Sequence, residues 1–161
     1  MSTELTTRDL IANYMEVGET PAYELMGAGF TSLDESPAAK TSSKRYVNDK
    51  SETKRISGYD WSTPFDSDLI KSEPVILFIK EVGEKQLTGA DAEANYVIVN
   101  LDEAIDAETD TYYARQIKVA VEVSSFKNND GEVAISGNLL GVGDVVEGKF
   151  DVATKTFTAE A

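Results

Sequence analysis

The amino-acid sequence predicts a mainly β protein, a β-sandwich or half-barrel with one flanking α-helix. Two observations support this. Apolar residues recur at every second position over much of the chain, and only one stretch has the clear spacing of an amphipathic helix. A single amphipathic helix among strands has to bury its apolar stripe against a sheet. The 161 residues have the length of one domain with a sizeable core.

The helix is predicted over residues 72–83. Its apolar residues fall at i, i+3, i+4 and i+7 on one face: Val75, Phe78, Ile79 and Val82. Ser72 is placed to cap the first turn, Pro74 loses no needed donor there, and Gly83 is placed to end the helix. A fully buried strand is the alternative for the apolar run 75–79.

The strands are predicted from alternation of apolar and polar residues between turn signals. They fall around residues 23–27, 57–65, 96–101, 117–123, 133–139, 146–152 and 156–158. The sequence Asn128-Asn129-Asp130-Gly131 supplies residues that tolerate positive φ in a hairpin turn. The last four strands therefore form a predicted antiparallel meander.

Two segments lack this pattern. Residues 1–20 are weakly patterned and are expected to form a flexible N-terminal arm, which leaves residues 21–161 as the folded domain. Within the domain, residues from about 31 to 55 are polar and rich in Ser, Thr and Lys, and predict a long basic loop. Such a long connection in a compact domain is usually functional or ordered by a partner.

Charge is distributed unevenly along the chain. The predicted loop holds six cations: Lys40, Lys44, Arg45, Lys50, Lys54 and Arg55. Residues 38–55 have a formal charge of +4, and since the whole chain carries −14, the remainder carries −18. This segment is either a solvated loop or a contact in which one copy meets the acidic surface of another. The acidic excess argues against a tightly held nucleic acid, because phosphate contacts need positive charge.

Composition removes several kinds of chemistry. The chain has no cysteine and no histidine, so it lacks a thiolate nucleophile and the usual general base near neutral pH. No apolar run approaches the roughly 20 residues that a membrane-spanning helix needs. The N-terminal residues contain no apolar signal segment, so we expect a protein that stays in a cytoplasm or leaves by a route other than a cleaved signal.

Acidic residues offer two further possibilities. Asp106, Glu108 and Asp110 have the 1-3-5 spacing that opens a calcium loop. However, Thr111 stands where the turn needs Gly, and Ile117 where the bidentate Glu belongs. We therefore expect a solvated acidic loop, with no metal and no cofactor. A hydrolase that uses a pair of carboxylates stays open as a weak alternative, because 29 acidic residues single out no pair.

An aromatic row follows the basic segment. Tyr59, Trp61 and Phe65 are predicted to share one face of a strand. Such a row is either core beneath the helix or the platform of a ligand-binding site. The second alternative describes a monomeric β-sandwich that binds a ligand on these aromatic side chains.

Two long segments together resemble a known protein family. The sequence KRYVNDKSETKRISGYDWSTPFDSDLI, leading into a helix at SEPV, is similar to the basic loop, aromatic strand and helix of tail tube (major tail) proteins from long-tailed bacteriophages of Gram-positive hosts. The ending SGNLLGVGDVVEGKFDVATKTFT resembles the C-terminal hairpins of the same family. The resemblance covers roughly residues 22–159 and includes no catalytic motif.

The resemblance implies a tail-tube-like fold in a structural protein that is not an enzyme. Subunits of that family form hexameric rings that stack around a tape-measure protein, between distal tail and tail terminator proteins. DNA later passes through the lumen without specific binding. The protein is then expected in the virion, after assembly in the host bacterial cytoplasm and without a membrane. The six cations of the basic segment are the expected contacts between subunits.

Overall fold

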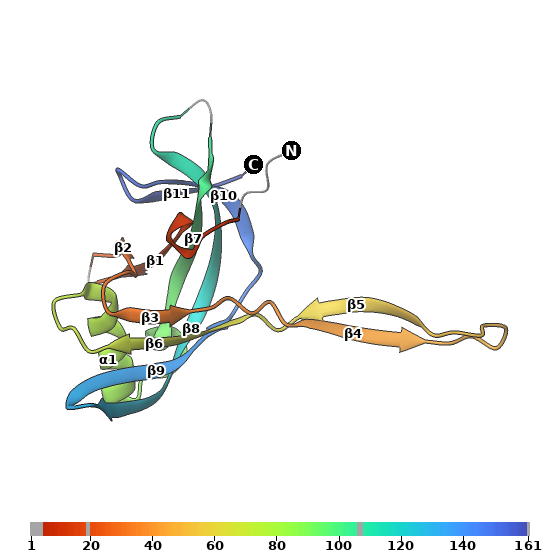
Figure 1. Ribbon diagram of the computed structural model, residues 1–161, viewed down its shortest axis with the longest axis horizontal. Helices are drawn as coiled ribbons and strands as arrows, with labels where there is room; N and C mark the ends of the chain where they lie inside the picture. Colours follow the sequence, from red (N-terminus) through yellow and green to blue (C-terminus); the bar gives the residue numbers. More distant parts are fainter. Residues whose placement is uncertain (1–4, 19, 106–107, 161) are drawn as a thin grey trace.

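The computed structural model describes residues 5–18, 20–105 and 108–160. It shows a curled sheet, an α-helix against the sheet and a long projecting hairpin (Figure 1). The strands are β1 (Ile11–Val17), β2 (Ala22–Leu25), β3 (Phe30–Leu33), β4 (Ala39–Lys44), β5 (Thr53–Tyr59), β6 (Ser62–Asp68), β7 (Glu93–Ala104), β8 (Thr111–Asn129), β9 (Glu132–Gly141), β10 (Val146–Asp151) and β11 (Thr156–Ala159). Two short 3₁₀ segments, η1 (Arg8–Leu10) and η2 (Gly89–Ala92), accompany the helix α1 (Pro74–Lys85). The prediction of a mainly β half-barrel with one flanking helix is confirmed.

The sheet is organised around β8, which is its longest strand. Along the sheet the strands run in the order β2-β1-β7-β8-β9-β6-β3, and all their pairings are antiparallel. One side of β8 pairs with β7. On the other side, residues 111–116 pair with β10 and residues 119–129 pair with β9. The four C-terminal strands were predicted correctly, but they are not a simple meander, because β10 pairs with β8 and not with β9.

Alternation along the central strands builds a core on each face of the sheet. In β7, Tyr96 and Ile98 face the helix side, whereas Val97 and Val99 face the opposite side. The helix side holds the larger cluster, which includes the buried helix residues Val75, Ile76, Ile79 and Val82. On the other face, the buried side chains are Tyr14, Tyr23, Val97, Val99, Ala114 and Phe150. Full burial of one aliphatic side chain stabilises a fold by about 1.5–3 kcal/mol, so the packing of the helix against the sheet contributes substantially to the stability of the fold.

The helix begins and ends about two residues later than its sequence signals indicated. Glu73 precedes the first turn, and Gln86 adopts the left-handed conformation after the last turn, with φ of 53°. Gly83, the predicted end, lies inside the helix. A Cβ there would come within 2.8 Å of Val123 and Phe126, so this glycine permits the close approach of α1 to β8.

The prediction of a flexible arm over residues 1–20 is wrong for residues 11–17, which form β1. This strand pairs with both β2 and β7, and the Met15 side chain is fully buried. Its residues alternate between the two cores, with Tyr14 on one face and Met15 on the other. The part of the predicted arm at residues 1–4 lies outside the described residues, as does Asp106 of the acidic loop.

Prediction: replacing Gly137 by alanine should destabilise the protein by about 1–3 kcal/mol. Gly137 lies in β9 opposite a bulge of β8, where an added Cβ would overlap the carbonyl oxygen of Glu122 and lie 3.1 Å from the Ser124 nitrogen. Urea unfolding measures the free energy of unfolding of each variant. Gly143→Ala is the control, because no atom lies within 4 Å of its added Cβ, and it should change stability by at most about 0.5 kcal/mol. Equal stabilities of the two variants would contradict this packing.

Candidate assembly interface

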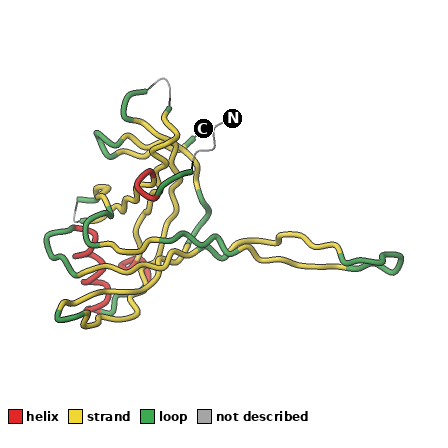
Figure 2. Tube along the Cα trace, in the orientation of Figure 1, coloured by secondary structure: helices red, strands yellow, loops and turns green. Residues whose placement is uncertain are grey.

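The predicted basic loop is a free-standing β-hairpin. Strands β4 and β5 form a two-stranded sheet of their own and project along the longest axis of the molecule, away from the rest of the body (Figures 1 and 2). Within residues 37–60, every residue is exposed except Ser42, Asp49 and Gly58, which are half-buried. The expectation of a loop from 31 to 55 is therefore corrected, because residues 39–44 and 53–59 are paired strands whose two faces are both solvated. A two-stranded hairpin without further support is marginally stable in water, so this ribbon is a candidate for contact with a partner.

All six predicted contact residues lie on this hairpin or in its turn. Lys40 lies at the root and forms an exposed ion pair with Asp60 at 3.8 Å. The remaining five form no ion pair with any residue in the described part of the chain: Lys44, Arg45, Lys50, Lys54 and Arg55.

The cations occupy both faces of the ribbon. Ser42 pairs with Arg55 and Ser43 pairs with Lys54, so Arg55 and Lys54 point to opposite faces. Lys44 lies two residues after Ser42 and shares the face of Arg55. A concave acidic surface fits such a ribbon better than a flat one does, because both faces of the ribbon then meet opposite charge.

The tip of the hairpin is ordered and carries exposed apolar side chains. The Asp49 carboxylate accepts a hydrogen bond from the Tyr46 backbone N–H at 3.0 Å, and the Asp49 N–H donates to the Tyr46 carbonyl at 3.0 Å. Val47 is fully exposed and Tyr46 is 63 % exposed. Apolar residues presented at the end of a projecting ribbon favour an interaction surface.

Hydrogen bonds across its two connections fix the root of the hairpin. Ser36 and Ser62 exchange backbone hydrogen bonds of 2.8 and 2.9 Å, and the Asp60 N–H donates to the Ala38 carbonyl at 3.0 Å. These contacts join the segment that enters the hairpin to the segment that leaves it. The hairpin therefore extends directly from β3 and β6.

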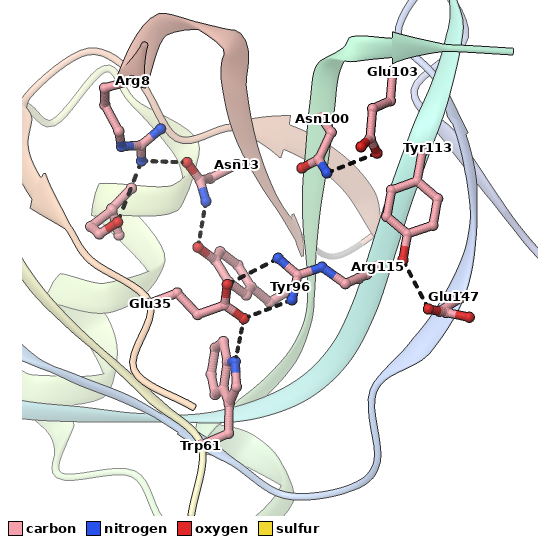
Figure 3. Close-up of polar contacts among 11 residues, drawn as sticks. Arg8, Asn13, Glu35, Trp61, Tyr96, Asn100, Glu103, Tyr113, Arg115 and Glu147 are labelled. Atoms are coloured by element: carbon pink, nitrogen blue, oxygen red, sulfur yellow. Dashed lines mark hydrogen bonds and ion pairs between the residues drawn. The ribbon is translucent and has the colours of Figure 1, made fainter. Parts of the chain in front are cut away.

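A half-buried ion pair holds this root against the central strand (Figure 3). Arg115 of β8 donates two hydrogen bonds to the Glu35 carboxylate, at 2.9 and 3.0 Å, and the Trp61 indole N–H donates a third at 2.7 Å. Burial raises the pKa of Glu35, but the hydrogen bonds from Arg115 and Trp61 and the charge of Arg115 outweigh it, so the pKa lies below its usual value. Glu35 is thus ionised at neutral pH, and it joins both hairpin connections to β8.

A second set of contacts connects the root to β1. Trp61 packs against Tyr96 with ring centroids 5.9 Å apart, and the Asn13 side-chain amide donates to the Tyr96 hydroxyl at 2.6 Å. Arg8 in turn donates to the Asn13 side-chain oxygen at 2.7 Å (Figure 3). The hairpin root, β7 and β1 are therefore linked by buried polar and aromatic contacts.

The aromatic row is divided between the body and the hairpin. Trp61 and Phe65 are buried, with exposed fractions of 9 % and 2 %, and belong to the core under α1. Tyr59 ends β5 and is 64 % exposed. The three aromatic residues therefore do not form one platform, because the chain leaves the hairpin between Tyr59 and Trp61.

Sequence reasoning did not find Glu35 and Arg115. They are 80 residues apart, and neither belongs to a motif in the sequence. Their partnership depends on the register that brings the β3–β4 connection beside β8, which no local pattern contains. The Trp61 indole, which needs a hydrogen-bond acceptor when buried, was the only local signal.

Within the described ranges, no group of three or more Asp and Glu side chains is arranged to hold a metal ion. No helix among these residues is long and apolar enough to cross a membrane.

Comparisons with known proteins find likeness in structure and none in sequence. No family model matches the sequence, and no curated protein matches it. The structure is similar to a chain in the cryo-EM structure of the anti-feeding prophage (AFP) baseplate, determined with 6-fold symmetry. The TM-score is 0.55 and the identity 12 %, over 91 % of this chain and 97 % of that one. The likeness shows that the two chains share a fold over nearly their whole lengths.

Prediction: Glu35→Gln should destabilise the protein by about 1–3 kcal/mol at pH 7, because the carboxylate accepts three hydrogen bonds, two of them from a cation. The folded-state pKa lies below 4.5, so the stabilisation is present above pH 4.5 and is lost as the pH falls below that value. Thermal or urea unfolding of both proteins from pH 7 to pH 3 measures the difference.

The control for this prediction is Asp60→Asn, which removes the exposed ion pair to Lys40 at the same root. Exposed pairs contribute about 0–1 kcal/mol, so this variant should unfold almost as the wild type does. A difference between Glu35→Gln and wild type that persists unchanged at pH 3 would contradict the role of the carboxylate charge.

Proposed function

We propose that this protein is a structural subunit of a phage-type tail tube, not an enzyme. It self-assembles into hexameric rings, and the rings stack to form the channel for DNA ejection. One observation carries the proposal: a basic hairpin, exposed on both faces, projects from a body of opposite charge. Such a separation of charge within one chain provides complementary surfaces for successive copies.

The shared fold supports an assembly with this symmetry. The chain of the AFP baseplate structure that it resembles was determined with 6-fold symmetry, and the likeness covers nearly the whole of both chains. Rings need a subunit whose two contacting surfaces differ, because head-to-tail contacts close into a ring when the rotation allows it. The hairpin provides one of these two surfaces.

The remaining acidic charge suits a conduit for DNA. Outside residues 38–55 the chain carries −18, and a negative surface repels phosphates, so DNA moves past it without being held. In this role the partners are further copies of the chain, a tape-measure protein, and the distal tail and tail terminator proteins. The location is the virion of a long-tailed phage, after assembly in the cytoplasm of a Gram-positive host.

Electron microscopy of the purified protein tests the proposal directly. Negatively stained samples across a concentration series should show rings or hollow tubes of uniform width. Sedimentation velocity at the same concentrations gives the mass of the assembled species. Particles that stay monomeric at the highest concentration would contradict self-assembly.

Prediction: replacing Lys44, Arg45, Lys54 and Arg55 together by glutamine should leave a folded monomer that does not polymerise. The four side chains are exposed and make no ion pair with the described part of the chain, so their loss should change the unfolding midpoint little. Assembly should require a concentration about tenfold higher or more, which corresponds to about 1.4 kcal/mol. Circular dichroism measures folding, and electron microscopy measures assembly.

The matched control removes four cations from the body and keeps the hairpin intact. It carries glutamine at Lys71, Lys80, Lys127 and Lys149, which gives the same change in net charge. This control should assemble at the wild-type concentration. Tubes of normal length from the hairpin variant would exclude a role of its charges in joining copies.

A further inference from the structure

An acidic groove lies at the end of the body opposite the hairpin. It has a volume of about 780 Å³ and runs between the turn that joins β1 to β2, the helix α1, and the segment from η2 into β7. The charged residues that line it are Glu16, Glu24, Glu81, Glu93 and Lys118, and Leu77 is an exposed large apolar residue of its lining.

The lining of this groove has a formal charge of −3, from four carboxylates and one lysine. Glu24 and Glu81 do contact lysines of their own chain, at 3.5 and 2.7 Å, but the first pair is partly exposed and the second well exposed, and ion pairs in contact with water are weak. Glu93 keeps one buried carboxylate oxygen that accepts no hydrogen bond from a residue the structure describes. Two of the four carboxylates, Glu16 and Glu93, therefore form no ion pair with a residue that the structure describes.

A second hollow of similar size carries less negative charge than the groove. That hollow has a volume of about 640 Å³ and lies between β1 and β3. Its charged residues are Arg8, Asp9 and Asp34, a formal charge of −1, and the Arg8 guanidinium there is engaged with Ile11 and Asn13. This hollow therefore presents less negative charge to a cationic ligand than the acidic groove does.

The acidic groove also presents apolar surface. Leu77 lies on the outer face of α1 and is 47 % exposed, although its helix neighbours Val75, Ile76 and Ile79 are buried. The hairpin tip offers the counterpart, because Val47 is fully exposed. Each surface thus combines charge of one sign with an exposed aliphatic side chain.

The hairpin cannot reach the groove of its own chain. In Figure 1, α1 and β2 lie at the left end of the molecule, whereas the hairpin extends to the right. At the rise per residue of a β-strand, the stretch from Ala38 to Val47 spans roughly 30 Å. The ribbon is directed away from the body (Figure 1). A contact between the two surfaces therefore joins different copies, head to tail, and repeats from one copy to the next.

We infer that the acidic groove beside α1 receives the β4–β5 hairpin of a second copy. Arg55 and Lys54, on opposite faces of the ribbon, meet carboxylates on the walls of the groove, and Val47 packs against Leu77. The inference rests on the proposed function, since both require copies of the chain to associate. It goes further by naming the surface that accepts the hairpin.

Site-specific cross-linking tests this contact, because the native chain has no cysteine. One preparation carries Val47→Cys and a second carries Leu77→Cys, and the two are mixed with a short bismaleimide. The control second chain carries Val142→Cys, whose side chain is 49 % exposed and so matches Leu77 in accessibility. We expect the Leu77→Cys mixture to give about tenfold more heterodimer or more, and equal yields would overturn the inference.

Charge reversal distinguishes this contact from others. A groove variant carries Glu24→Lys and Glu81→Lys, and a hairpin variant carries Lys44→Glu and Lys54→Glu. Each variant alone should fail to associate, because its groove and its hairpin then carry charge of the same sign. A one-to-one mixture should recover association, because the reversed groove of one variant meets the reversed hairpin of the other, and the unchanged hairpin meets the unchanged groove. Circular dichroism verifies that both variants fold.

The outcomes separate this inference from the proposed function. Tubes from wild type together with normal association of the groove variant would overturn the groove as the receptor and leave the tube proposal standing. Cross-linking from position 47 to position 77 without rings or tubes would support the groove and contradict the tube. Failure of the mixture to recover association would overturn the pairing of these charges.

Discussion

Backbone pairing along β8 is the constraint on which the rest of the structure depends. One side of this 19-residue strand pairs with β7, and the other side is shared between β10 and β9. Because each partner occupies a defined stretch, the register of β8 determines where both hairpins of the C-terminal region attach. It also determines the position of Arg115, which lies in the stretch between β7 and β10 and reaches the hairpin root. The bulge opposite Gly137 bends the second half of the strand, and the sheet curls accordingly.

Keeping a basic ribbon away from an acidic body requires a rigid root. In a chain of net charge −14, a mobile cationic segment is attracted to its own surface. At physiological salt, charges interact over only about 8 Å, so a ribbon held outward at several times that distance escapes this attraction. The ion pair between Glu35 and Arg115 and the paired backbones of Ser36 and Ser62 hold it there. The cations therefore remain accessible to another molecule.

The sequence contains enough to predict the fold class, the helix and the C-terminal strands. Alternation in β8 to β11 and the turn at Asn128–Gly131 are local signals, and they place those elements correctly. The N-terminal strand β1 was missed, because its apolar residues face both cores and so lose the period of two. The sequence predicts a loop where the hairpin lies, since neither face of the hairpin is buried and no alternation of polarity marks its strands.

The candidate interface was also predicted only in part. Its cations were visible as a run of charge, because composition alone reveals them. The ion pair between Glu35 and Arg115 and the acidic groove were not visible in the sequence. Both join residues that are distant in the sequence and come together only through the register of the sheet. The aromatic row was predicted in part, because Trp61 and Phe65 are core beneath the helix, whereas Tyr59, two residues before Trp61, lies on the exposed hairpin.

The direct continuity of the hairpin with β3 and β6 has a mechanical consequence. In Figure 1 both strands run along the axis of the ribbon, so a pull on the tip acts along their length. Strand β6 is paired with β9 at seven residue positions. A pull along the strands loads all seven pairs together in shear, whereas a pull across the strands would open them one after another. The ion pair between Glu35 and Arg115 adds resistance at the root of the ribbon. Force applied through this ribbon is thus transmitted into the centre of the sheet without first unzipping an edge.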